Sequence, residues 1–271
     1  MYDPSSSANI NEATVEHISL DWVVDFQNRR IAGSAVLSLS IIKPTNKIIL
    51  DSRSLEIQDA KLDGETVKYQ IENAGVLGEK IVVDDLDFLI LHEQKKELTF
   101  IYRTGKQCTA LQFLEAEQTA TKKRPYLFSQ CQAIHARSII PCMDTPSVKQ
   151  TYDAVVAVPN DLVCLMSAIA TGQPQEVGEL RKFAFKQPVR IPSYLVAIVV
   201  GLMEKRDLSA RSSIWAEPPV VDKAFYEFGE TEKMLRAAES LAGKYEWGRY
   251  DLVVLPPSFP FGGMENPCLT F

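Results

Sequence analysis

Residues 18–26 read ISLDWVVDF, and this stretch decides the fold class because apolar and polar side chains alternate along it. Its apolar positions are Ile18, Leu20, Trp22, Val24 and Phe26. A period of two is typical of a β-strand that buries one face. Residues 28–30 (NRR) form a turn signal, and residues 31–41 alternate in the same way. The two runs therefore predict a long β-hairpin.

Outward from this hairpin, short apolar runs separated by turn residues continue the β pattern. The dipeptide Asp63-Gly64 is a strong hairpin signal between two of these runs. Residues 1–13 are polar and predict a leader that is frayed or ordered late. Segment 109–148 is less regular. The further predicted strands are 47–50, 55–62, 66–71, 81–83, 98–102, 152–158, 162–169, 180–186 and 194–203.

A charged run at residues 204–207 (EKRD) is interpreted as a break that ends the β-rich part. The chain beyond it changes character. Residues 214–216 and 250–255 predict strands, and residues 230–245 predict an amphipathic helix. The apolar face of that helix carries Met234, Ala237, Ala238, Leu241 and Tyr245. We therefore predict a β-rich domain over residues 1–205 and the beginning of an α/β domain over residues 206–271.

The composition is that of an ordinary globular protein, with 46% hydrophobic and 24% charged residues in 271. A net charge of −6 gives no electrostatic reason to expect a nucleic-acid partner. The longest apolar run, residues 194–203, is about half of the length that a membrane span needs, so no membrane partner is expected. Five widely spaced cysteines favour reduced thiols in a cytoplasmic protein over a disulfide framework.

The last twelve residues, 260–271, read PFGGMENPCLTF and carry the candidate chemistry. Adjacent Gly262 and Gly263 let a backbone lie against a ligand without an intervening Cβ. Glu265 follows two residues later, and Pro267 biases Asn266 toward an extended conformation. This pattern predicts an extended edge that adds a peptide as a further strand and presents one acid to a cation. The alternative is a plain Gly-Gly turn with a solvated glutamate.

Residues 262–266 (GGMEN) resemble the G-[GA]-M-E-N exopeptidase motif of the gluzincin class of zinc aminopeptidases. The double glycine and the following PCLTF are most similar to the leukotriene-A(4) hydrolase and aminopeptidase B branch. Residues 129–133 (SQCQA) and 141–149 (PCMDTPSVK) resemble two further motifs of the same family, in the same order. The resemblance implies a saddle-shaped, mostly β domain, followed by the incomplete start of a thermolysin-like catalytic domain.

The same resemblance implies the site residues and the reaction. Glu265 of the motif 262–266, which includes Met264 and Asn266, would bind the free α-amine of a peptide substrate. Gln132 would assist it, with Gln130 nearby in the chain. In the family a zinc-bound water attacks the first peptide carbonyl, and the leukotriene branch also opens a lipid epoxide. Peptides with a free N-terminal amine, and in that branch a lipid epoxide, are the expected partners.

The zinc-binding sequence H-E-x-x-H of this family is absent from the 271 residues. The nearest match is residues 92–96 (HEQKK), in which Lys96 stands at the position of the second histidine and would repel a dication. Cys131 and His135, four residues apart, could be imagined as a nucleophile and base, but a buried structural cysteine is the commoner arrangement. We expect no catalytic residue and no metal ligand in this chain.

Two hypotheses follow. In the first, the chain is a fragment of a zinc aminopeptidase whose product continues past Phe271 into the zinc motif. In the second, it is a truncated product without catalysis that acts as a binding or interaction module. Residue preference, epoxide hydrolysis and oligomeric state have no signal in this sequence.

Overall fold

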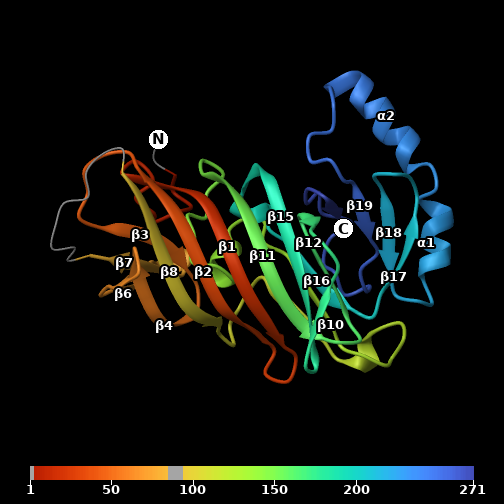
Figure 1. Cartoon of the computed structure of the whole chain (residues 1–271), viewed down its shortest axis with the longest axis horizontal. Helices are drawn as coiled ribbons and strands as arrows, with labels where there is room; N and C mark the ends of the chain where they lie inside the picture. Colours follow the sequence, from red (N-terminus) through yellow and green to blue (C-terminus); the bar gives the residue numbers. More distant parts are fainter. Residues whose placement is uncertain (1–2, 85–93) are drawn as a thin grey trace. The chain divides into compact units, whose positions relative to one another are not determined.

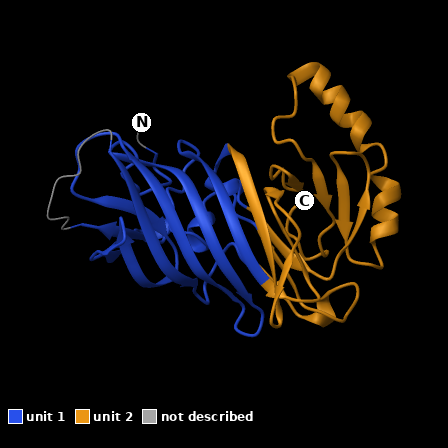
Figure 2. Ribbon diagram, viewed as in Figure 1, with its two compact units in different colours: residues 1–111, 130–157, 190–196 blue, residues 112–129, 158–189, 197–271 orange. Residues whose placement is uncertain are grey.

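The computed structural model describes residues 3–84 and 94–271, which form two compact units (Figure 2). The first unit comprises residues 1–111, 130–157 and 190–196, and the second comprises residues 112–129, 158–189 and 197–271. The chain therefore passes between the units several times. The predicted division at 205/206 concerns where the catalytic domain of the family begins, and it stays a prediction.

The first unit is built almost entirely of strands, as the alternating sequence pattern predicts (Figure 1). In its larger sheet the order is β11-β1-β2-β8-β4-β5, and a smaller sheet has the order β3-β7-β6. Its strands are β1 (Ala13–Asp25), β2 (Arg30–Ile41), β3 (Ile48–Ser52), β4 (Leu55–Leu62), β5 (Glu65–Thr66), β6 (Gln70–Asn73), β7 (Glu79–Val83), β8 (Lys95–Thr104) and most of β11 (Lys149–Pro159). Its 3-10 turns are η1 (Gly75–Leu77), η3 (Ala136–Ser138) and η4 (Ser193–Leu195).

The predicted hairpin is confirmed, because β1 and β2 pair antiparallel with Leu20 opposite Ala35. The residues of the β1 core face are buried: Ile18, Leu20, Trp22 and Val24. A register shift between Val15 and His17 explains why the buried positions slip by one residue near the start of the strand. Within the core, the indole N–H of Trp22 donates to the Tyr102 hydroxyl at 2.9 Å, and that hydroxyl donates to the carbonyl of Ile139 at 2.7 Å.

A buried ion cluster holds the irregular part of the first unit, and it explains what residues 141–149 do locally. The Arg137 guanidinium lies 3.0 Å from Asp144 and 3.7 Å from Asp51, and all three side chains are buried. Burial raises the pKa of Asp144, while hydrogen bonds from Ser193 and Arg137 oppose that rise. Cys142 pairs with Asp51 through the backbone. These residues of the family motif therefore stabilise the unit.

The predicted frayed leader is wrong for residues 3–9, because this segment is tied to the same cluster. The carbonyl of Ser5 accepts a hydrogen bond from Arg137 at 2.7 Å, and the Ser7 N–H donates to Asp51 at 2.8 Å. Asn9 accepts from the Ile49 N–H at 2.8 Å. Polar composition alone suggested disorder, but these polar groups satisfy buried partners of the core.

The second unit contains three sets of strands and the α-helices. Sheets run in the orders β12-β16-β10-β9 and β17-β18-β19-β20, and β15 pairs with β13 and β14. The strands are β9 (Leu111–Leu114), β10 (Tyr126–Ser129), β12 (Val163–Met166), β13 (Ile169–Ala170), β14 (Gln175–Val177), β15 (Leu180–Pro192), β16 (Ile198–Gly201), β17 (Glu204–Asp207), β18 (Ser213–Ala216), β19 (Asp251–Val253) and β20 (Leu269–Thr270). The helical segments are η2 (Ala116–Gln118), α1 (Val221–Glu227) and α2 (Thr231–Ala242).

One expectation for this unit needs correction and another is confirmed. Residues 204–207 are no break, because they form β17 and pair with β18, their charged side chains facing largely outward from an edge strand. The helix α2 is confirmed, but its apolar face is exposed: Met234 is 70% and Leu241 90% accessible. Its inner side instead carries Leu235 and the carboxylates that bind Arg211. In residues 3–84 and 94–271, no helix is long and apolar enough to cross a membrane.

Candidate functional site

Residues 264–271 of the second unit form a closed turn that contains the last three residues of the predicted motif 262–266. The Met264 N–H donates to the Phe271 carbonyl at 3.1 Å, and the Phe271 N–H donates to the Met264 carbonyl at 2.9 Å. Within the turn, the Leu269 N–H donates to the Asn266 carbonyl at 3.2 Å. The expected free edge is therefore corrected at Met264, whose backbone groups are already paired. The pairing holds the motif in one conformation before any ligand arrives.

The two glycines of the motif have different roles. A Cβ on Gly263 would lie 3.0 Å from the Phe271 carbonyl oxygen, so the close approach of the two segments favours glycine. A Cβ on Gly262 would meet nothing within 4 Å, and this residue is exposed. In the described part of the chain, neither glycine makes a hydrogen bond. Their N–H and C=O groups are therefore available to an extended ligand.

Glu265 is presented to solvent between two anchored neighbours. Met264 and Asn266 are each 3% exposed, whereas the Glu265 side chain is exposed. Within residues 3–84 and 94–271, the Glu265 carboxylate makes no hydrogen bond or ion pair. The buried Asn266 Nδ2 also lacks a partner in these residues. A carboxylate held at both sides but left without a partner can accept a cation with little rearrangement.

Cys268 anchors the turn to the rest of the second unit, a role that the sequence did not predict. Its N–H donates to the Tyr245 hydroxyl at 3.3 Å, and its carbonyl accepts from the Asp251 N–H at 3.3 Å. Its Sγ lies 3.6 Å from both the Gln187 Nε2 and the Trp247 carbonyl oxygen. Burial raises the pKa of its thiol to about 11, so the group is a neutral thiol near pH 7. No sequence signal marks these contacts, because the partners lie 17 to 81 positions away.

The two predicted glutamines belong to the first unit. The Gln130 N–H donates to the Ala110 carbonyl at 2.8 Å, and its side chain is half-buried. Gln132 is exposed in the turn that the His135 N–H closes onto the Cys131 carbonyl at 2.8 Å. Because residues 262–266 lie in the other unit, the joint use of these glutamines with Glu265 stays a prediction.

Cys131 and His135 make no side-chain hydrogen bond to each other. The imidazole Nδ1 of His135 pairs instead with the Thr109 hydroxyl at 2.8 Å. Burial raises the pKa of the Cys131 thiol well above its ordinary value and lowers the pKa of His135. The thiol is therefore protonated near pH 7 and lacks a base, which favours the structural interpretation.

The side chains that the structure describes do not fit a zinc ion. Within residues 3–84 and 94–271, no three His, Cys, Asp or Glu side chains are grouped so as to hold a metal. His17 already uses both ring nitrogens, on Thr151 and Asp153, each at 2.7 Å. Of the near-match at 92–96, His92 and Glu93 lie outside the described residues. The described residues therefore do not assemble the donor set that zinc requires.

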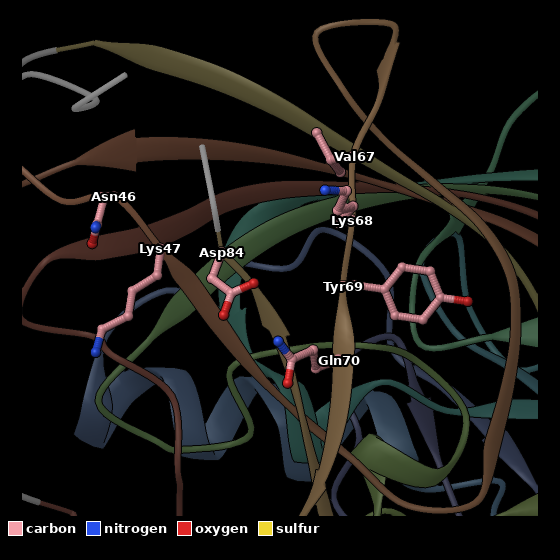
Figure 3. A pocket seen from close by; sticks show the side chains of 7 residues that line it. All are labelled: Asn46, Lys47, Val67, Lys68, Tyr69, Gln70 and Asp84. Carbon is pink, nitrogen blue, oxygen red and sulfur yellow. The ribbon is translucent and has the colours of Figure 1, made fainter. Parts of the chain in front are cut away.

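A hollow of about 890 Å³ in the first unit contains none of the predicted site residues. It is lined by Asn46, Lys47, Val67, Lys68, Tyr69, Gln70 and Asp84. Figure 3 shows that these side chains are spread along the recess and do not converge on one point. The Tyr69 hydroxyl is already used, since it donates to the Ile57 carbonyl at 3.1 Å. The recess therefore offers no assembled set of polar groups for a small ligand.

The β-rich fold and the GGMEN motif were compared with known protein families. Residues 14–195 match the Peptidase M1 N-terminal domain. The chain belongs to the M1 family of peptidases.

Among individual proteins, the chain is 45% identical over 274 residues to leukotriene A-4 hydrolase of Xenopus laevis, a match covering 100% of this chain and 45% of that protein. It is 41% identical over 270 residues to leucine aminopeptidase 2-1 of Meyerozyma guilliermondii, with 99% and 42% covered. The solved structure of native leukotriene A4 hydrolase from Saccharomyces cerevisiae superposes with a TM-score of 0.89 at 35% identity, covering 100% of this chain and 42% of that one. The chain thus spans less than half the length of these relatives.

Proposed function

We propose that this chain is the N-terminal part of a zinc aminopeptidase and supplies the group that binds the substrate amine. One observation carries the proposal: Glu265 is exposed between buried Met264 and Asn266, in a turn closed by Phe271, and it has no partner among residues 3–84 and 94–271. Membership of the M1 family supports the reaction class. The relatives are more than twice as long as this chain, which supports its being a fragment.

The proposed selectivity for free N-termini comes from charge pairing. A peptide α-amine is cationic below its pKa of about 8, and an ammonium next to the Glu265 carboxylate gains a charge-assisted hydrogen bond. An acetylated terminus has neither the charge nor the three N–H donors. It would leave the carboxylate without a cationic partner, so that blocked peptides bind poorly.

The backbone of the motif would align the rest of the peptide. The N–H and C=O groups of Gly262 and Gly263 have no partner in the part of the chain that the structure describes, and the absence of Cβ atoms lets an extended substrate approach closely. We further propose that the exposed Gln132 amide assists Glu265, with Gln130 nearby in the chain. Both roles rest on the family resemblance of residues 129–133.

Bond cleavage would require groups that the described residues do not contain. Zinc in this family activates a water for attack on the peptide carbonyl, and its ligands would come from chain beyond Phe271. The 271 residues alone are therefore proposed to lack catalysis. Hydrolysis of a lipid epoxide by the longer protein is proposed only from its likeness to leukotriene A-4 hydrolase. A cytoplasmic location is proposed from the five free cysteines.

The test is Glu265→Ala in a longer form of this chain that carries the zinc-binding helix of the family. A bound substrate would bury the pair between its amine and Glu265, and removing one partner of a buried charge pair costs about 2–5 kcal/mol, which is roughly 30-fold to several thousand-fold in kcat/KM. We expect that loss for free-amine peptides, unchanged zinc content, and far less effect on N-acetylated peptides.

Glu246→Ala is the matched control, because Glu246 is also an exposed carboxylate of the second unit without a partner in the described residues. It should leave kcat/KM nearly unchanged, and the 271-residue chain should show no turnover. If Glu265→Ala spared free-amine peptides, or harmed acetylated ones equally, the amine-binding role would be refuted. Zinc-dependent turnover by the 271 residues alone would refute the fragment hypothesis, whereas peptide binding without turnover in the longer form would favour the binding module.

A further inference from the structure

The second unit contains a cavity of about 300 Å³ that is separate from Glu265 and has both an apolar and a charged end. Strands β12, β13, β15, β17, β18, β19 and β20 contribute to its wall. A volume of this size lies at the lower end of the range for small-molecule sites. We propose that this cavity binds a small monocarboxylate with an apolar, preferably aromatic, body.

The apolar end is formed by well-buried side chains. Met166 and Leu269 are each 2% exposed and Phe185 is 4% exposed. Ile169 is half-buried at the edge of the cavity. These residues offer carbon surfaces and no hydrogen-bonding side chain. Burying an apolar ligand body there gains roughly 25 cal/mol per Å² of apolar surface.

The charged end is organised by Asp251. Its carboxylate accepts hydrogen bonds from the Ser213 N–H at 2.9 Å, from the Arg249 Nε at 2.8 Å and from the Trp215 Nε1 at 3.4 Å. Its capacity as an acceptor is thus largely used, and its charge is matched by Arg249. Asp251 therefore orients Arg249 and Trp215 rather than offering a site for a cationic ligand.

Arg249 is left with binding capacity. Its Nε and Nη2 donate to Asp251 and to the Ser213 hydroxyl, whereas its Nη1 has no partner among residues 3–84 and 94–271. The side chain lines the cavity and is 29% exposed. Lys205 also lines the cavity, but its Nζ already pairs with Asp207 Oδ1 at 2.7 Å and lies 6.0 Å from the centre of the Trp215 ring. An anion would find a donor on Arg249, whereas the carboxylates of Asp207 and Asp251 are already paired with Lys205 and Arg249 and leave a cation no ready partner.

The ligand class follows from these two ends. A carboxylate accepts a charge-assisted hydrogen bond from the guanidinium, and this bond is stronger than the one that a neutral amide accepts. Trp215 and Phe185 both line the cavity, which favours an aromatic body in the ligand. Phenylalkanoic acids have this layout, with one terminal carboxylate and a compact apolar body.

The experiment titrates 4-phenylbutyrate into the 271-residue chain by calorimetry, with 4-phenylbutyramide and 4-phenylbutylamine as matched neutral and cationic probes. We expect the acid to bind about tenfold or more tightly than the amide, since a hydrogen bond to a charged group is worth more than a neutral one. The amine should bind least. Failure of the acid to bind at 10 mM, or equal binding of acid and amide, would overturn the proposal.

Two variants locate the site. Ile169→Trp fills the cavity from its edge and should abolish binding of the acid. Arg249→Met should lower the affinity of the acid about tenfold while leaving the amide unchanged. Arg236→Met is the control, because Arg236 lies on α2 and is 75% exposed outside the cavity. If Arg249→Met fails to fold, Ile169→Trp and the comparison of probes decide the matter. Unchanged binding of the acid in Ile169→Trp would place it elsewhere and refute this site.

Discussion

Replacement of Arg137 by methionine tests whether the buried ion cluster stabilises the first unit. The guanidinium is fully buried and donates to Asp144 Oδ2 at 3.0 Å, to the Leu77 carbonyl at 3.0 Å and to the Ser5 carbonyl at 2.7 Å. Methionine keeps an unbranched apolar stem but removes the charge and all of these donors. Asp51 and Asp144 then remain buried without a cation.

The expected cost follows from that uncompensated charge. Breaking a buried ion pair from one side costs about 3–5 kcal/mol, which is a large share of a typical domain stability of about 5–15 kcal/mol. At roughly 2–4 °C per kcal/mol for a unit of about 150 residues, the melting temperature should fall by about 6–20 °C. The segment at residues 3–9 should also lose its protection in hydrogen exchange, because Ser5 loses its donor.

The pH dependence gives an independent check. Burial raises the pKa of Asp144, and loss of Arg137 removes a charge that opposes this rise. In Arg137→Met, burying the Asp144 carboxylate therefore costs the most folding free energy when the carboxylate is ionised. The deficit of Arg137→Met should be complete above the folded pKa and should shrink as the pH falls toward the ordinary value of 3.8.

Arg190→Met provides the control for these melts, because Arg190 is 54% exposed and pairs with Glu16 on the surface of the same unit. It should cost less than about 1 kcal/mol. If Arg137→Met were no more destabilising than this control, or if its deficit stayed constant down to acidic pH, the uncompensated-carboxylate argument would be refuted.

Two further predictions concern the second unit. Hydrogen bonds from Arg211 hold the pKa of Glu239 down at about 2. The stability that this ion pair gives to α2 is therefore complete above pH 4.5 and is lost as the pH falls toward 2. Hydrogen exchange at pH 3 should show α2 opening, and Glu239→Gln should show the same opening already at pH 7. Gly263→Ala should push the Phe271 carbonyl away and speed amide exchange at Met264, whereas Gly262→Ala should not; equal exchange in both variants would contradict the role given to the close approach.

Much of the fold was predictable where side chains alternate. The hairpin β1–β2 and the turn at Asp63-Gly64 follow from local pattern, because one face of each strand is buried and the other is not. Strand β10 escaped prediction within the irregular segment 109–148 because all four of its residues are buried, which leaves no alternation. Helix α1 escaped because it is seven residues long and has no side-chain cap.

The sequence motif of the candidate site was predictable, but the contacts that hold the motif in place were not. Residues 262–266 stand out locally, whereas the pairing of Met264 with Phe271 and the contacts of Cys268 with Tyr245 depend on chain closure. The leader was mispredicted for a similar reason. A polar segment looks disordered until buried partners such as Asp51 and Arg137, distant in sequence, are known.

The parallel pairing of β1 with β11 has a consequence for the order in which the chain assembles. One edge of β1 is covered by β2 soon after it in sequence, but the other edge is covered only by residues 151–157 of β11. During synthesis from the N-terminus, one edge of β1 in the β1–β2 hairpin therefore stays unpaired while more than a hundred further residues are synthesised. Such long-range pairing slows folding, and an open apolar edge invites association with other chains. Newly made chains are for this reason most vulnerable to aggregation before β11 has left the ribosome.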